Sequence, residues 1–372
     1  MSRYKIAWLP GDGVGNDVME AAQIVLDALK LDAEYVHGDI GWEFWKTEGN
    51  PLPDRTIEMM KQTDCALFGA ITSKPKDEAV KELAPALRDK GLVYFSPIVR
   101  LRQEFDLYVN MRPCKAFAGN PLNYRDDIDL VVFRENTQGM YAGVEFYPVD
   151  AGLKQAMADR NSKMKRFMDV PDDEIAISTR IITKEGAERI IRAAFEYAGT
   201  AGKKTVTLVE KPNVLRETGG MMTRVARDVA LDFPGIELWE TNIDAMCMWL
   251  VKNPQNYGVL VAENLFGDII SDLSAQLVGG LGFASSASTG DNYAVFEPTH
   301  GSAPKYAGRY KVNSMAMLLS VKLMLDYLKE TDKAMRLENA ISEVIREEKI
   351  RTYDMGGSNT SLEVAEAVAG KL

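Results

Sequence analysis

The chain is organised around one stretch, Glu263-Asn264-Leu265-Phe266-Gly267-Asp268-Ile269-Ile270-Ser271-Asp272-Leu273. The apolar run 258–262 precedes it, so we expect a strand, a short turn and a helix that begins near Gly267. On such a helix Asp268 and Asp272 stand one turn apart on the same face. Two hard oxygen ligands on one face favour a Mg²⁺ or Mn²⁺ site. The alternative is a helix N-terminus whose acids complement the helix dipole.

A third acid, Asp244, adds weight to the metal interpretation. It lies in the segment 241–246, just before a helical pattern of apolar residues. The alternative for Asp244 is an ordinary helix N-cap.

Composition bounds the classes of function. The 372 residues allow one to three domains and a large core, and the 46% apolar and 26% charged content is typical of a soluble globular protein. The net charge of −10 argues against non-specific binding to nucleic acid or to an anionic membrane. Anionic substrates must therefore be held by local arginine clusters.

The cysteines and histidines exclude further classes of site. Cys65, Cys114 and Cys247 lie far apart, so neither a disulfide framework nor a zinc site is indicated. We expect a reducing cytoplasm, since the chain opens without a charged-then-apolar leader and no apolar run reaches membrane-spanning length. With only His37 and His300 present, acid–base chemistry is expected to fall to tyrosine, lysine and carboxylates.

The N-terminal third has the alternation of an α/β protein. A strand over 4–9 leads through a glycine turn into a helix over 19–29. The turn lacks the third glycine of a Rossmann loop, because position 16 is Asn. A strand over 34–38, a helix near 57–61 and a strand over 66–69 then predict a mainly parallel sheet covered by helices. The polar segment 71–91 is expected to be a mobile surface segment.

Three arginines lie where an anion could be bound. We expect Arg102 in a helix, Arg112 at the end of a strand-like run and Arg134 at the end of the apolar run 129–133. An arginine that closes a buried strand needs an anionic partner, and bidentate recognition of a carboxylate is its usual role. Tyr141 follows among glycines, which makes a packed-core tyrosine less favoured.

The middle of the chain contains an excursion and a candidate base. Residues 144–174 are polar and are expected to form an exposed arm that binds a partner. A strand over 175–182, a helix over 184–197 and a strand over 203–209 follow, the last ending beside Lys211 and Asn213. Such a lysine is usually exposed; beside the acids named above it could serve as a base with a shifted pKa.

The C-terminal third contains a candidate phosphate loop. Residues 279–288 are expected to form a loop or a close-packed crossing, and 296–308 a rigid loop that presents backbone N–H groups to a phosphate. Lys305 and Tyr306 would add a charge and a hydroxyl there. The apolar helix 315–328 is assigned to the core, and 362–368 to a short helix.

Taken together, these motifs resemble the metal-dependent β-decarboxylating dehydrogenases, which include isocitrate, 3-isopropylmalate, homoisocitrate and D-malate/tartrate dehydrogenases. The resemblance runs from residues 9–15 to residues 353–357, and within the family we expect an enzyme like isocitrate dehydrogenase. It implies an isopropylmalate dehydrogenase-like α/β fold of two domains, not a true Rossmann fold. The large domain would take residues 1–107 and 279–372. The small domain, 108–278, would carry the intersubunit arm at about 144–174 and the dimer interface.

The resemblance also implies the roles of individual residues. The expected substrate-binding residues are Ser96, Arg102, Arg112, Arg134 and Asn213. The expected catalytic residues are Tyr141, which protonates an enolate, and Lys211, which takes the hydroxyl proton directly or through water. The expected metal ligands are Asp244, Asp268 and Asp272. Family members are homodimers or larger with shared sites, so Lys211 and Asp244 are expected to act in a neighbouring subunit.

The resemblance partly indicates the cofactor. The expected cofactor-binding residues are His300, Gly301, Ser302, Ala303, Lys305, Tyr306, Asn313 and Tyr353. NAD-using relatives generally carry Asp-Ile in place of Lys305-Tyr306, which favours NADP. An arginine often found four residues beyond the second tyrosine is Gly357 here, so use of NAD stays open.

The resemblance leaves the substrate less defined. Ser96 matches isocitrate dehydrogenases, whereas Ile98 replaces their asparagine and Val99 could suit an isopropyl tail. Arg100 could reach a distal carboxylate or stay exposed. Oxidation of isocitrate to 2-oxoglutarate and CO₂ is expected first, 3-isopropylmalate or homoisocitrate next, and D-malate or tartrate after them. A different class, the non-catalytic regulatory subunit, is disfavoured because the catalytic residues are all present.

Overall fold

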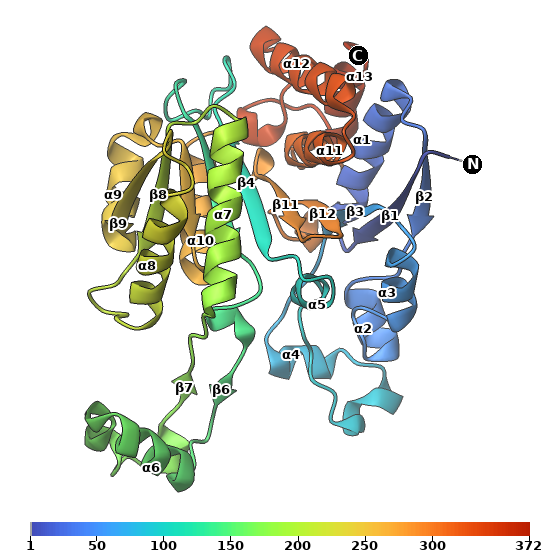
Figure 1. The fold of residues 1–372 in the computed structure, drawn as a ribbon. Helices are drawn as coiled ribbons and strands as arrows, with labels where there is room; N and C mark the ends of the chain where they lie inside the picture. Colours follow the sequence, from blue (N-terminus) through green and yellow to red (C-terminus); the bar gives the residue numbers. More distant parts are fainter. Residues whose placement is uncertain (1) are drawn as a thin grey trace.

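Ten strands form one mixed sheet that runs through the whole molecule in the computed structural model, which describes residues 2–372 (Figure 1). The order is β2-β1-β3-β12-β11-β4-β5-β10-β8-β9. The strands are β1 (Tyr4–Gly11), β2 (Ala33–His37), β3 (Cys65–Ala70), β4 (Val109–Lys115), β5 (Asp129–Glu135), β8 (Thr205–Glu210), β9 (Glu237–Asn242), β10 (Val259–Ala262), β11 (Ser285–Thr289) and β12 (Ala294–Pro298).

The expectation of a mainly parallel α/β sheet is confirmed. Strand pairs on both flanks run parallel, whereas β12, β11, β4 and β5 pair antiparallel at the centre. The chain ends supply β1, β2, β3, β11 and β12, and residues 109–262 supply the other five strands. The two sets meet where β11 pairs with β4, so one continuous sheet joins them.

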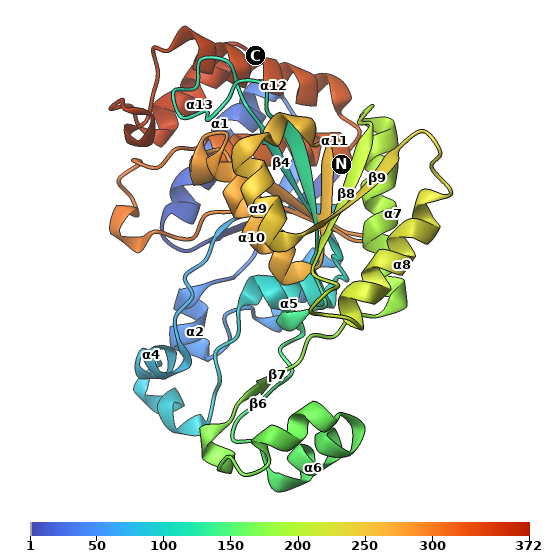
Figure 2. The same cartoon turned by 90° about the vertical axis from the view of Figure 1, so that its left-hand side faces the viewer.

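Helices cover both faces of each half of the sheet. They are α1 (Val14–Leu29), α2 (Trp42–Glu48), α3 (Asp54–Met60), α4 (Lys76–Lys81), α5 (Pro97–Glu104), α6 (Ala151–Arg160), α7 (Lys184–Thr200), α8 (Thr218–Ala230), α9 (Ile243–Lys252), α10 (Asn264–Gln276), α11 (Met315–Tyr327), α12 (Thr331–Glu347) and α13 (Ser361–Ala369). In the half that residues 109–262 build, α7 and α8 lie on one face and α9 and α10 on the other (Figure 2). None of the helices within residues 2–372 combines the length and the apolarity needed to span a membrane.

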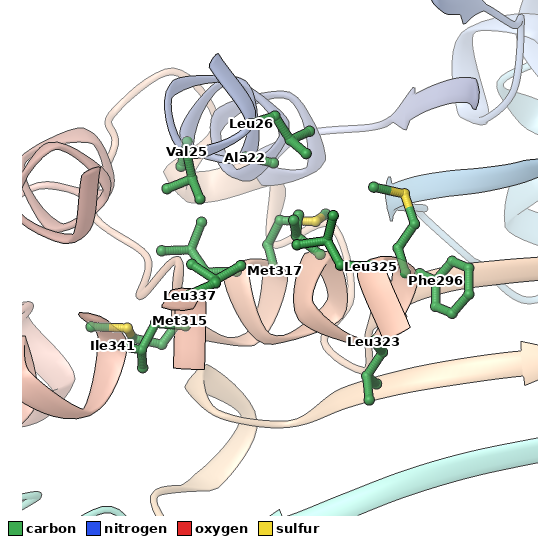
Figure 3. Packing of buried hydrophobic residues seen from close by; sticks show 14 of the residues in the cluster. Ala22, Val25, Leu26, Phe296, Met315, Met317, Leu323, Leu325, Leu337 and Ile341 are labelled. Atoms are coloured by element: carbon green, nitrogen blue, oxygen red, sulfur yellow. The ribbon is translucent and has the colours of Figure 1, made fainter. Parts of the chain in front are cut away.

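The largest core cluster lies under the helices from both chain ends. Ala22, Val25 and Leu26 of α1 lie over α11, whose Leu323 points to the opposite side, and Leu337 and Ile341 belong to the same cluster (Figure 3). The assignment of residues 315–328 to the core is therefore confirmed. This packing joins the N-terminal and C-terminal segments into one unit beside the central strands.

The segment 144–174 projects away from the sheet. Strands β6 (Glu145–Phe146) and β7 (Ile177–Ser178) form a separate two-stranded ribbon with α6 beyond it (Figures 1 and 2). The expectation of an exposed excursion is confirmed. The strand expected over 175–182 is wrong in length, since only two of its residues pair as a strand.

Several element boundaries differ from the sequence-based expectations. Helix α10 begins at Asn264 and not near Gly267, because the Glu263 carboxylate accepts a hydrogen bond from the backbone N–H of Phe266 at 3.0 Å and caps the helix earlier. Asp244 lies inside the first turn of α9 and Asn242 takes the N-cap position, so the N-cap alternative is wrong. The expected loop over 279–288 contains most of β11.

The segment 71–91 is also more regular than expected. It contains α4 and a short 3₁₀ helix, Pro85–Lys90. Ala79 and Leu83 are buried against Trp42 and Trp45 of α2, a helix that the sequence analysis did not predict. Apolar residues spaced through a polar stretch therefore fix this segment to the body of the protein.

Candidate active site

The candidate site forms where α10 passes close to the end of β5. At Gly267 a Cβ atom would lie 2.7 Å from the Cβ of Arg134, so only glycine permits this approach. Asp268 follows directly and forms an ion pair with Arg134. Asp272 lies one helical turn further on, so the spacing predicted for the two aspartates is confirmed.

Arg134 is held in a nearly inaccessible position. Its side chain is 2% exposed, and Nε and Nη2 donate hydrogen bonds to Asn264 Oδ1 at 3.0 and 2.8 Å. Burial, and after it the neighbouring Arg112 and Arg102 charges, lower the pKa of Arg134 to about 10. Arg134 therefore stays charged at neutral pH and presents its remaining donor to Asp268.

Arg112 adds a second cation at the same point. It comes from β4, and Nη1 donates to Ser271 Oγ at 2.7 Å while lying 3.4 Å from Asp268 and 3.3 Å from Asp272. Nε donates to Asn110 Oδ1 at 2.7 Å, which fixes the plane of the guanidinium. Arg112 is thus oriented by its own strand and by α10.

Arg102 completes a group of three buried guanidiniums. It lies in α5, as expected, and its Nη2 donates to Glu297 Oε1 at 3.2 Å. Its buried Nε has no hydrogen-bond partner within residues 2–372. An unsatisfied buried donor beside two other arginines fits an anionic ligand that supplies the missing acceptor.

The balance between burial and the nearby arginine charges sets the pKa values of Asp268 and Asp272 in opposite directions. Burial raises the pKa of Asp268, but the Arg134 and Arg112 charges outweigh burial and leave that pKa below its ordinary value. For Asp272, burial dominates and raises the pKa. Two carboxylates on one helix face, one of them firmly ionised, are a donor set that suits a hard divalent cation.

Tyr141 lies against the same carboxylate. Its hydroxyl donates to Asp268 Oδ2 at 2.5 Å, and its ring lies under the Arg134 guanidinium, 4.9 Å from centroid to Cζ. Burial, and then the Asp268 carboxylate, raise the pKa of Tyr141. At neutral pH it is a protonated donor that can deliver a proton.

Lys211 and Asp244 form a separate pair. Lys211 follows β8 and its ammonium binds the Asp244 carboxylate at the start of α9, which lowers the pKa of Asp244. Within residues 2–372, three His, Cys, Asp or Glu side chains nowhere gather as they would around one metal ion. One chain therefore does not bring Asp244 together with Asp268 and Asp272. Asn213 is exposed in the turn that follows Lys211.

Ser96 and its neighbours lie at the start of α5. Ser96 takes the N-cap position, but its hydroxyl accepts no capping hydrogen bond from a backbone N–H. Ile98 packs against a buried apolar cluster, and Arg100 donates to the Leu52 carbonyl at 3.0 Å and to Asp54 at 2.8 Å. The side chains of Ile98 and Arg100 are therefore already in contact with other residues of the same chain.

A cavity of about 520 Å³ gathers most of the expected cofactor residues. Those that line it are His300, Gly301, Ala303, Tyr306, Asn313 and Tyr353. The Tyr306 and Tyr353 rings stack with centroids 6.0 Å apart, and Asn313 donates to Asp354 at 3.1 Å. Ser302 is buried, with its hydroxyl 2.7 Å from that of Thr72, and Lys305 is exposed and immediately precedes Tyr306.

The segment 300–310, which carries most of the expected cofactor-binding residues, is hydrogen-bonded to the start of α1. Val14, which also lines the cavity, donates its backbone N–H to the Ser302 carbonyl at 2.8 Å. Asp17, buried in α1, accepts from the backbone N–H groups of Gly308 and Tyr310. Burial lowers the pKa of His300, whose Nε2 is buried without a partner in the described chain. The size of this open cavity, the stacked rings and the unsatisfied His300 fit an adenine nucleotide.

Three buried charged residues were not predicted from the sequence: Arg180, Glu210 and Glu263. Glu210 immediately precedes Lys211, and Glu263 opens the stretch that carries both aspartates. Because Glu210 and Glu263 adjoin candidate site residues in the sequence, they could have been identified as part of the site. Arg180 follows the polar arm and gave no signal of burial.

Comparison with known proteins identifies relatives along the whole chain. A family model described as isocitrate/isopropylmalate dehydrogenase matches residues 5–369. A 3-isopropylmalate dehydrogenase of Archaeoglobus fulgidus is 40% identical over 368 residues, covering 99% of each chain. An isocitrate/homoisocitrate dehydrogenase of Thermus thermophilus is 39% identical over 370 residues, with 99% of this chain and 98% of that protein covered.

Two further matches extend the comparison. Protein DlpA of Legionella pneumophila is 40% identical over 366 residues; the match spans 98% of this chain but only 58% of the length of DlpA. The crystal structure of isocitrate dehydrogenase from Methylococcus capsulatus superposes with a TM-score of 0.85 at 35% identity, and each chain is covered to 99%. The likeness in fold and the likeness in sequence therefore both extend over nearly the whole chain.

Proposed function

Because the chain belongs to the isocitrate/isopropylmalate dehydrogenase family, whose members are NAD(P)-dependent decarboxylating dehydrogenases, we propose that it oxidatively decarboxylates a 3-substituted (2R)-malate. Isocitrate, giving 2-oxoglutarate and CO₂, is the proposed substrate. The observation that carries the proposal is the convergence of Arg102, Arg112 and Arg134 on one carboxylate-lined point.

The arginines support a substrate with at least two carboxylates. Three guanidiniums buried together repel one another, and the acids within reach, Glu297, Asp268 and Asp272, do not satisfy all their donors. Planar guanidiniums bind carboxylates in bidentate fashion, which also fixes the orientation of the substrate. Malate-type carboxylates supply this geometry.

Tyr141 and Lys211 supply the proton transfers. Tyr141 is protonated at neutral pH and hydrogen-bonded at Asp268, so it is the proposed donor to the carbon that loses CO₂. Lys211 is the proposed base for the substrate hydroxyl, acting in the site of a second copy. Its pairing with Asp244, away from Asp268, supports that assignment.

Asp268 and Asp272, with Asp244 of a second copy, are the residues that would hold Mg²⁺ or Mn²⁺. Such a cation lowers the pKa of a bound hydroxyl and neutralises charge that develops on substrate oxygens. The cavity beside Tyr306 and Tyr353 would hold the nicotinamide cofactor, which accepts the hydride. We propose NADP as the preferred cofactor, since Lys305 is exposed, immediately precedes Tyr306 and offers charge to a 2′-phosphate.

A homodimer or larger assembly follows from the divided site. Exposed apolar side chains on α9 and α10 support this: Met248 is 55%, Val251 47% and Ile269 46% exposed. Helix α9 carries Asp244, and helix α10 carries Asp268 and Asp272. Pairing two copies through α9 and α10 would cover this apolar surface and complete each site.

The test is steady-state oxidation by the purified chain with Mg²⁺. Isocitrate, 3-isopropylmalate, homoisocitrate and D-malate are each offered with NADP⁺ and with NAD⁺. A dominant kcat/KM for isocitrate with NADP⁺ is expected. Preference for another malate derivative would replace isocitrate as the substrate, and the absence of turnover with all four would favour the regulatory-subunit alternative.

A further inference from the structure

A buried ion cluster is centred on Arg180. Its side chain is 8% exposed and forms an ion pair with Glu210, and its Nε lies 3.6 Å from Glu263 Oε2. Nη1 donates to Thr218 Oγ1 at 3.0 Å, and the guanidinium lies 5.1 Å from the centroid of the Phe266 ring. One cation thus contacts two acids that are far apart in sequence.

The Glu210 side of the cluster holds the turn that carries Lys211. Glu210 ends β8 and is 1% exposed, and its Oε2 accepts the backbone N–H of Lys211 at 2.9 Å. Gly219 in α8 packs so closely that an added Cβ would lie 2.7 Å from the same oxygen. The direction in which the chain leaves β8 is therefore fixed by a carboxylate that Arg180 neutralises.

The Glu263 side holds the helix that carries Asp268. Glu263 is 2% exposed, and its Oε1 caps α10 by accepting the N–H of Phe266. Its Oε2, the atom nearest Arg180, has no hydrogen-bond partner in residues 2–372. The cap sets where α10 begins, and hence where Asp268 lies along it.

Arg180 itself is placed by the root of the arm. It follows β7, and the next residue, Ile181, exchanges backbone hydrogen bonds with Gly139. Gly139 starts the turn that carries Tyr141, and an added Cβ there would lie 2.6 Å from Glu263 Oε2. The Arg180 guanidinium therefore lies where the root of the arm, the Tyr141 turn, Glu210 and Glu263 come together.

From these contacts we propose that Arg180 is a positioning residue that holds the turn carrying Lys211 and the helix carrying Asp268 in a fixed relation to each other. The inference rests on the proposed function, which gives these two elements their roles. Because Lys211 is proposed to serve a second copy, the same contact links the two sites of a dimer. Without Arg180, two buried carboxylates would face each other unneutralised, and one or both elements would shift.

The test is a double-mutant cycle read out by Mn²⁺ binding, measured by electron paramagnetic resonance on the full-length protein. Glu210→Gln removes the charge beside Lys211, and Glu210 is not one of the acids assigned to the metal. We expect Glu210→Gln to weaken Mn²⁺ binding about tenfold in the native background and less than about twofold in an Arg180→Met background. Equal effects in both backgrounds, or none, would overturn the inference.

A second readout separates positioning from loss of structure. It is the pH profile of kcat, whose limb both Arg180→Met and Glu210→Gln are expected to shift in the same direction. Arg180→Lys, which keeps the charge but only part of the contacts, is expected to recover part of the Mn²⁺ affinity. A pH profile unmoved by either variant would reduce Arg180 to a structural residue.

The controls keep this inference apart from the proposed function. Arg227→Met breaks the exposed ion pair with Glu240, and it is expected to leave Mn²⁺ affinity within about twofold. Asp268→Asn is expected to abolish Mn²⁺ binding. If it does so while the Arg180 cycle is additive, only the present inference fails; if it does not, the metal assignment itself fails.

Discussion

Asp268 is the residue on which the candidate site converges. Its two oxygens contact Arg134 and Tyr141, and Arg112 lies within 3.4 Å. The carboxylate therefore holds in place the groups proposed to bind and protonate the substrate. An amide at this position would keep the shape and lose the charge.

We predict that Asp268→Asn lowers kcat/KM at least about a thousandfold at low Mg²⁺ while the protein stays folded. The reason is that the amide neither ligates a divalent cation well nor balances the buried Arg134. Turnover is measured against Mg²⁺ concentration, with circular dichroism for the fold. Asp228→Asn, on the exposed face of α8, is the matched control. Unchanged activity of Asp268→Asn would remove the metal assignment.

Lys305 is the residue that tests the cofactor preference. Lys305→Asp with Tyr306→Ile would place a carboxylate where it can accept from a ribose diol and repel a 2′-phosphate. We predict that the ratio of kcat/KM for NADP⁺ to that for NAD⁺ falls about tenfold or more. Lys311→Asp makes the same change of charge on the exposed chain nearby and should leave the ratio unchanged. An unaltered ratio in the double variant would count against NADP.

The sequence predicted individual candidate residues where charge sits at a strand end or on one helix face. Arg134 and the pair Asp268 and Asp272 are of this kind, and the structure brings them together. The sequence could not show which charges are buried together, because Arg180 and Glu210 come into contact only through the tertiary fold. Nor could it show that Arg100 is engaged by Asp54.

At the scale of elements, the site depends on how closely α10 approaches β5. Gly267→Ala would force its new Cβ against the Arg134 side chain at 2.7 Å. We predict a loss of about 1–3 kcal/mol in the free energy of unfolding and weaker Mn²⁺ binding, measured by chemical denaturation and by Mn²⁺ titration.

Gly199→Ala provides the matched comparison. Gly199 lies in α7, where an added Cβ would meet only the Ile236 Cδ1 at 3.8 Å. The same substitution there should stabilise the protein by up to about 1 kcal/mol, since it replaces the poorest non-proline helix former by the best. Equal effects at the two glycines would show that the α10–β5 contact is not tight.

Helix α12 is tied to the sheet by a carboxylate whose protonation can be followed. Burial raises the pKa of Glu338, but the hydrogen bond from Lys115 of β4 and the charge of Lys322 of α11 outweigh it, so the pKa is lowered. A lowered carboxyl pKa stabilises the folded state above the unfolded pKa of about 4.3. This contribution is lost as the pH falls through the lower, folded pKa.

We therefore predict that Glu338→Gln destabilises the protein by about 1 kcal/mol at pH 7 and by less at pH 3.5. The free energy of unfolding is measured in urea at both pH values. Glu366→Gln, at an exposed position of α13, should change neither. A loss for Glu338→Gln that is the same at both pH values would contradict the ion-pair account.

Periodicity predicted the existence of strongly apolar elements better than their ends. The helices α7 and α11 lie close to the expected ranges, whereas α1 begins at Val14, five residues before the expected start. Helix α10 also starts earlier, because of a side-chain cap that the apolar pattern does not encode. Helices α2 and α4 were missed because their few apolar residues are buried by contacts between segments. Local propensity does not contain that information.

At the scale of the whole molecule, one sheet joins two sets of strands at β11 and β4. We propose that this junction separates a large domain, residues 1–107 and 279–372, from a small domain, 108–278. Arg102 and Glu297 come from the first, and Arg112, Arg134 and both aspartates of α10 from the second. The substrate would therefore be held between the two.

The alternation of strands and helices predicted the α/β class, and the failed glycine spacing correctly argued against a Rossmann loop. The antiparallel centre of the sheet was not predicted, because strand order depends on pairing between distant segments. The division of the site between Lys211 with Asp244 and Asp268 with Asp272 was implied by the resemblance to the family, and the geometry of one chain agrees with it.

We propose that two copies of the chain complete each site. It is tested most directly by a heterodimer of one Lys211→Met chain and one Asp268→Asn chain, carrying different tags and purified by both. Each homodimer should be inactive, whereas in the heterodimer one site would combine a native Asp268 with a native Lys211. We predict about half the native kcat for this heterodimer, with the other site dead. An inactive heterodimer would contradict the claim and place the whole site within a single chain.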